Sequence, residues 1–135
     1  MSECAVFDSS VLIDHLRTNR YARRMVNLDL PVRNCSVVLA ELWRGASSPT
    51  DRKIVAALER GHPILTPTQD HWLKSGQILA KIRDKHGFAP AKLRDLHFDV
   101  LISLTVRGYG ARLITSNRAD FELIRRYLDF KLEVW

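Results

Sequence analysis

Cysteine is scarce in this chain of 135 residues. Cys4 and Cys35 are its two cysteines, and they neither form a CxxC pair nor have a histidine at metal-ligand spacing. The five histidines also lack such spacing among themselves. The sequence therefore shows no pattern of a disulfide framework or a zinc site. We expect both cysteines to be small core residues in a reducing compartment.

Long apolar runs and glycine-rich phosphate loops are missing too. No apolar run approaches the roughly 18 residues that span a bilayer, and the first residues lack the basic-then-apolar layout of a signal peptide. We therefore expect a soluble, cytoplasmic protein that does not associate with a membrane. Neither GxGxxG nor GxxxxGK[ST] occurs in the chain, so nucleotide binding through such a loop is unsupported.

The charge balance is basic. Lysine and arginine number 21 against 15 aspartates and glutamates, which gives a formal net charge of +6. Such a surplus favours a polyanionic partner such as a nucleic acid, although only weakly, because many soluble proteins carry one.

Short apolar segments alternate with longer amphipathic ones along the chain. Strands are predicted for residues 4–7, 31–38, 111–115 and 131–135, and helices for residues 9–17, 38–46, 51–61, 70–87, 93–110 and 118–128. This alternation predicts an α/β fold with a mostly parallel central sheet flanked by helices. Neither a repeat nor a linker divides the sequence, so we expect one domain over residues 1–135.

Acidic residues follow three of the predicted strands. Asp8 comes directly after residues 4–7, Glu41 lies early in the helix after the second strand, and Asp120 lies just after residues 111–115. In open α/β sheets, ligands bind outside the carboxyl ends of the strands. Connectivity alone therefore places three carboxylates at one edge of the sheet.

A fourth acid lies in an apolar setting. Asp99 belongs to the segment HFDVLISL, which is too apolar for a wholly exposed helix face. Burying a carboxylate is costly unless it is paired or binds a metal ion. Asp95 is four residues earlier, so it shares a face with Asp99 and repels it.

Four carboxylates in one cleft predict a bound divalent cation. Their mutual repulsion would raise their pKa values unless positive charge lies among them. Oxygen ligands without thiolate or imidazole select Mg²⁺ or Mn²⁺ over zinc. Two such ions would balance the formal negative charge of the four carboxylates. Two-metal sites are typical of enzymes that cleave phosphodiesters.

Simpler roles exist for each acid. Asp8 and Asp120 could each be the N-cap of the helix that follows, Glu41 could be a surface acid, and Asp99 could be structural. A phosphohydrolase with an aspartyl nucleophile is a different class of enzyme, but it favours a DxD sequence, and Ser10 stands where the second aspartate would be.

Several segments together resemble the PIN-domain ribonucleases. They are VFDSSVLID with Asp8, SVVLAELWRGA with Glu41, FDVLISLTVRGYGARLITSN with Asp99, and RADF with Asp120. The small size and the AELWRGA segment are most similar to the VapC-type toxins of toxin–antitoxin modules. The resemblance covers nearly the whole chain, in the order and spacing of the family.

This resemblance implies a metal-dependent endoribonuclease that uses Mg²⁺ or Mn²⁺. It implies that the catalytic and metal-binding residues are Asp8, Glu41, Asp99 and Asp120, supported by Ser10, Thr115 and Asn117. It further implies an RNA substrate, a cognate antitoxin that holds the enzyme inactive, and a homodimer. A catalytically silent PIN-like domain that binds RNA or a partner is the alternative. The family often has a polar residue before the third acid, where this chain has Phe98.

Overall fold

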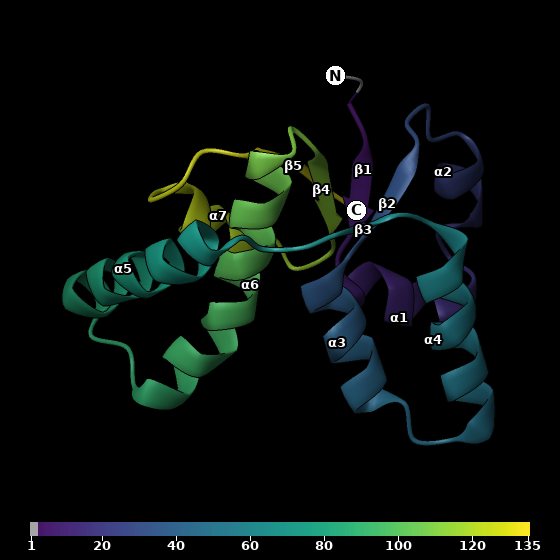
Figure 1. The fold of residues 1–135 in the computed structure, drawn as a ribbon, viewed down its shortest axis with the longest axis horizontal. Coiled ribbons are helices and arrows are strands. Elements are labelled where there is room, and N and C mark those ends of the chain that lie inside the picture. Colours follow the sequence, from purple (N-terminus) through teal and green to yellow (C-terminus); the bar gives the residue numbers. More distant parts are fainter. Residues whose placement is uncertain (1–2) are drawn as a thin grey trace.

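The computed structural model describes residues 3–135 as a parallel sheet with helices packed around it (Figure 1). Its strands are β1 (Ala5–Phe7), β2 (Val32–Cys35), β3 (Ile64–Leu65), β4 (Arg112–Thr115) and β5 (Lys131–Val134). They lie in the order β3-β2-β1-β4-β5, and every neighbouring pair is parallel. The predicted α/β fold with a parallel central sheet is confirmed.

Seven helices connect and cover the strands within these residues. They are α1 (Ser9–Thr18), α2 (Ala22–Val26), α3 (Ser36–Gly45), α4 (Pro49–Gly61), α5 (Gln69–His86), α6 (Pro90–Gly108) and α7 (Arg118–Arg125). None of the helices in the described part of the chain has both the length and the apolar character needed to cross a membrane.

The sequence patterns missed the shortest helix and the shortest strand, and they misplaced several boundaries. Helix α2 has five residues and strand β3 has two, which is too short for a periodic pattern to be visible. The second strand was predicted to continue to residue 38, but it ends at Cys35, and the two following valines lie in the first turn of α3. There, packing overrides the β-propensity of valine.

The sheet separates two apolar cores, as the alternation of side chains along a strand requires. Val6 and Leu113 belong to the larger core, which also contains side chains from α3 to α7. Phe7 and Ile114 belong to the smaller core. There the ring of Trp135 packs edge-on against the ring of Phe7, with 5.4 Å between the ring centres. Both cysteines are buried and free, as expected.

The register of the central strands positions the candidate site. Phe7 of β1 is paired with Ile114 of β4, and the amide of Asp8 donates to the Ile114 carbonyl at 2.8 Å. Asp8 and Thr115 are therefore neighbours at the carboxyl end of the sheet.

Candidate functional site

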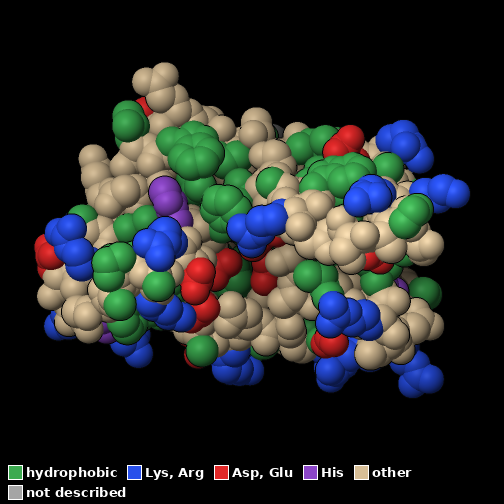
Figure 2. Space-filling view, turned by 90° about the horizontal axis from the view of Figure 1, so that it is seen from below, with side chains coloured by type: hydrophobic (Ala, Val, Ile, Leu, Met, Phe, Trp, Pro, Cys, Tyr) green, Lys and Arg blue, Asp and Glu red, His purple; other side chains and the backbone are tan. Residues whose placement is uncertain are grey.

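A polar cleft of about 320 Å³ lies at the carboxyl ends of the central strands. The residues that line it are Asp8, Ser9, Ser10, Ile13, Glu41, Arg44, Arg94, Asp95, Phe98, Asp99, Asn117 and Asp120. Figure 2 views the side of the molecule on which the strands end, and acidic side chains gather there in a central hollow with basic side chains beside it. The fold thus brings together all four acids that the sequence predicted for the site.

Asp8 is buried at the floor of the cleft, with 3% of its surface exposed. One carboxylate oxygen, Oδ2, accepts hydrogen bonds from Ser10 Oγ at 2.8 Å and from Thr115 Oγ1 at 2.9 Å. Asp8 does occupy the N-cap position of α1, but its side chain makes no capping hydrogen bond. The two hydroxyls orient the carboxylate instead, and no described residue donates to its Oδ1.

Glu41 reaches the cleft from α3 and is partly buried. Its carboxylate accepts a long hydrogen bond of 3.5 Å from Ser9 Oγ. Burial, followed by the negative charge of Asp8, raises the pKa of Glu41 to about 7, although Arg44 and Ser9 act in the opposite direction. The ionised form of Glu41 is therefore disfavoured by its surroundings.

Asp99 is the most perturbed acid of the cleft. Burial, followed by the charges of Asp8, Glu41 and Asp120, raises the pKa of its carboxyl group to about 8. The positive charge of Lys92 opposes them. No described residue donates a hydrogen bond to the Asp99 carboxylate or forms an ion pair with it.

Asp120 differs because both of its oxygens are bonded. Lys92 Nζ is 2.9 Å from Oδ1 and Asn117 Nδ2 is 3.2 Å from Oδ2. Asn117 is also the N-cap of α7, and its side chain accepts from the amide of Asp120. Asn117 thus serves both the helix and the carboxylate, whereas Asp120 is not itself the cap.

The donor set fits a hard divalent cation, although the side chains do not enclose one. Among the described His, Cys, Asp and Glu residues, no group of three is arranged so that it could hold a metal ion. The chemistry is nevertheless suitable: all donors are oxygens, Asp8 Oδ1 is available, and neither Asp99 nor Glu41 forms an ion pair with a described residue.

The cleft also contains residues that the sequence patterns did not single out. Arg44 and Arg94 line it without an ion pair to any described residue, and the guanidinium of Arg44 lies 5.7 Å from the centre of the Phe98 ring. Lys92 could have been found from its spacing, since it lies seven residues before Asp99 and therefore on the same helical face. Asp14 lies outside the cleft.

The model of the PIN domain family matches residues 5–127. The chain belongs to the PIN domain family. The matched range includes the positions of all four predicted acids. A comparison with curated protein sequences found no match.

Solved structures support this PIN fold. The chain is similar to a chain of VapBC-1 from nontypeable Haemophilus influenzae, with a TM-score of 0.72 and 21% identity over 98% of each chain. It is similar to a chain of DNA-bound VapBC from Salmonella typhimurium, with a TM-score of 0.71 and 21% identity over 98% of each chain. VapBC-5 from Mycobacterium tuberculosis, a member of a family of toxin-antitoxin systems, has a TM-score of 0.61 and 21% identity over 98% of each chain. At this identity the likeness establishes a shared fold.

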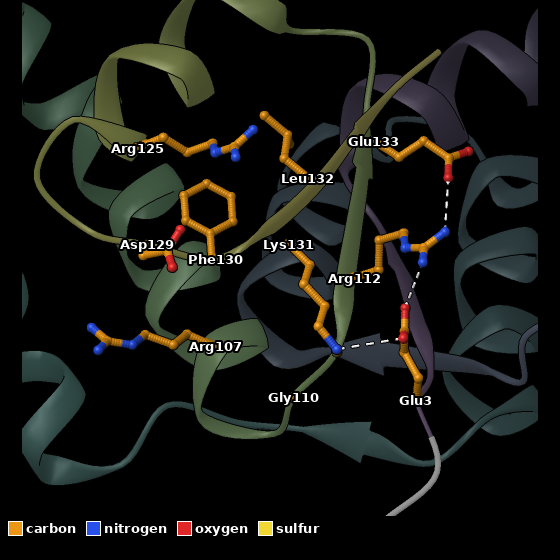
Figure 3. A pocket seen from close by; sticks show the side chains of 11 residues that line it. Glu3, Arg107, Gly110, Arg112, Arg125, Asp129, Phe130, Lys131, Leu132 and Glu133 are labelled. Carbon is orange, nitrogen blue, oxygen red and sulfur yellow. Dashed lines mark hydrogen bonds and ion pairs between the residues drawn. The ribbon is translucent and has the colours of Figure 1, made fainter.

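A larger cavity of about 720 Å³ lies away from the acidic cleft, along β5 and the beginning of β4 (Figure 3). Its charges are largely paired: Lys131 Nζ lies 3.4 Å from Glu3, and Arg112 contacts Glu3 at 2.8 Å and Glu133 at 3.1 Å. These ion pairs form an open chain that links Glu3, just before β1, with β4 and β5. The cavity has no surplus of carboxylates that would call for a metal ion, so size alone does not make it the site.

Proposed function

We propose that this PIN domain is a VapC-type toxin, an endoribonuclease that depends on Mg²⁺ or Mn²⁺. One observation carries the proposal: three carboxylates from three separate elements converge in one cleft without a cation to pair with them. Asp8 follows β1, Glu41 is on α3 and Asp99 is on α6. Groups whose pKa values are strongly raised by burial and like charge, and which line a cleft, are typical of functional sites.

Asp8, Glu41 and Asp99 would hold the metal ion, and Asp120 would complete its surroundings directly or through water. A divalent ion in such a site activates water and stabilises the charge that develops on a phosphodiester. The rest of the work belongs to the chain itself. Ser10 and Thr115 keep the Asp8 carboxylate in one orientation through their hydrogen bonds to its Oδ2.

The margin of the cleft has the charge that an RNA backbone needs. Arg44 and Arg94 line it, and the chain as a whole carries a net charge of +6. Contacts from arginine to phosphates position a nucleic acid, whereas the metal-binding acids act on the bond to be cut. The ring of Phe98, beside Arg44, adds a flat apolar surface on which an unstacked base could lie.

We further propose that an antitoxin holds the enzyme inactive and that the chain forms a homodimer. Structural neighbours are named as VapBC toxin-antitoxin systems, and one is described as bound to DNA. The antitoxin would insert its C-terminal segment into the acidic cleft. A basic side chain on that segment would supply the positive charge that Asp99 and Glu41 lack.

The test is cleavage of cellular RNA by the purified protein, with Mg²⁺ or Mn²⁺ and with a chelator. We expect new RNA 5′ ends with metal and none with EDTA, and mapping these ends would identify the cleavage context. Cleavage that persists in EDTA would refute the metal mechanism. A protein that binds RNA but neither cuts it nor binds Mn²⁺ would be the catalytically silent PIN-like domain.

A further inference from the structure

Asp120 is the acid of the cleft that already has a positive partner. Its Oδ1 is 2.9 Å from Lys92 Nζ, and its Oδ2 accepts from Asn117. Asp8, Glu41 and Asp99 form no ion pair with any described residue. The four acids predicted for the site therefore divide into three that lack an ion pair and one that is paired with a lysine.

The position of Lys92 is unusual for a cation. The N-cap of α6 is Ala89, so Lys92 is the third residue of the helix, where the helix dipole disfavours positive charge. Asp120 is the third residue of α7, where a negative charge is favoured. Local helix preference therefore explains Asp120 but not Lys92, which is explained by the contact between the two side chains. A local rule that is broken beside a candidate site is a mark of function.

The charge of Lys92 reaches beyond its own partner. It acts on Asp99, seven residues further along the same face of α6, where it opposes the effect of the other acids. Its side chain is 40% exposed, so the ammonium group lies at the edge of the cleft rather than in the core. From there it contacts Asp120, which lines the cleft.

We propose that Lys92 takes the place of a second metal ion, so that the cleft binds one divalent cation at Asp8, Glu41 and Asp99. The proposal rests on the metal site put forward above, but not on the identity of the RNA. A second ion at Asp120 would have to displace Lys92 and Asn117 and then lie beside the displaced ammonium group. The repulsion between the two cations opposes this arrangement. In this account Lys92 is a positioning residue that holds Asp120 and supplies fixed positive charge.

The experiment counts Mn²⁺ ions per chain by calorimetric titration, with free Mn²⁺ checked by electron paramagnetic resonance. We expect one ion for the wild type, one for Lys92→Arg, which keeps the charge, and two for Lys92→Met. The control is Lys131→Met, which breaks a lysine–carboxylate pair at the far cavity and should bind one ion (Figure 3). Melting temperatures establish that each variant is folded.

The outcomes separate this inference from the proposed function. Two ions on the wild type, or one ion on Lys92→Met as on the wild type, would overturn the role of Lys92 and leave a metal-dependent nuclease in place. No bound Mn²⁺ on the wild type would overturn both. Loss of the single ion in Lys92→Arg, with the fold intact, would also overturn the inference, because arginine keeps the positive charge.

Discussion

Replacing Asp99 by asparagine tests the site most directly, because it should weaken the enzyme and strengthen the fold. The substitution keeps the shape of the side chain and removes a charge that its surroundings oppose. The pKa of Asp99 is raised from 3.8 to about 8. At about 1.36 kcal/mol per pKa unit, the ionised form costs at most about 6 kcal/mol.

The effect on stability should be smaller than this limit. Water enters the open cleft and side chains relax, so we expect Asp99→Asn to gain about 1–2 kcal/mol in chelator at pH 8, which is roughly 3–8 °C in melting temperature. The pH dependence has a definite sign. Because the folded state holds the proton more tightly than the unfolded chain, Asp99 costs no stability below pH 4, and its cost grows as the pH rises to about 8. The gain from the variant should therefore be larger at pH 8 than at pH 5.

Asp14→Asn is the matched control. The Asp14 carboxylate lies outside the cleft and is 3.3 Å from Arg20 in a largely exposed ion pair, so its loss should change stability by less than about 1 kcal/mol. Cleavage should fall by about 10²-fold or more in Asp99→Asn and stay near wild type in Asp14→Asn. Chemical unfolding at both pH values, with EDTA and with Mn²⁺, completes the assay. A less stable Asp99→Asn protein at pH 8, or full activity, would refute the reasoning.

Three further predictions concern the surroundings of the acids. Adding EDTA should abolish cleavage and lower the melting temperature relative to Mn²⁺, since a ligand that binds only the folded state stabilises it; equal melting temperatures would contradict the metal site. Arg44→Ala and Arg94→Ala should each weaken RNA binding and make the RNA affinity less dependent on salt, by the equivalent of about one phosphate contact. Arg125→Ala, at the far cavity, should change neither property. Measuring the RNA affinity between about 50 and 200 mM salt tests this prediction. Thr115→Val removes the hydroxyl that donates to the buried carboxylate of Asp8, so it should lower the free energy of unfolding by about 1–3 kcal/mol. It should also lower the rate of RNA cleavage more than it weakens RNA binding. An unchanged cleavage rate would show that the orientation of Asp8 is not needed.

Much of the fold was visible in the sequence because its signals are local. Apolar strands followed by amphipathic helices predict a parallel sheet, and acids at strand ends are placed at one edge by connectivity. The caps were less predictable: Asp8 stands at an N-cap position, yet its carboxylate is bound by Ser10 and Thr115. The choice between a cap and a site depends on a residue more than 100 positions away, which no local pattern contains.

The sequence by itself determined the fold class and the candidate acids, since periodicity and the alternation of strands with helices are properties of neighbouring residues. The tertiary structure alone decided how those acids differ. Burial and mutual repulsion raise the pKa values of Glu41 on α3 and Asp99 on α6. The packing of α6 beside α7 instead pairs Asp120 with Lys92. Burial and the distances between charges arise only when distant segments meet. The chemistry of each carboxylate therefore belongs to the folded molecule, although its presence could be foreseen in the sequence.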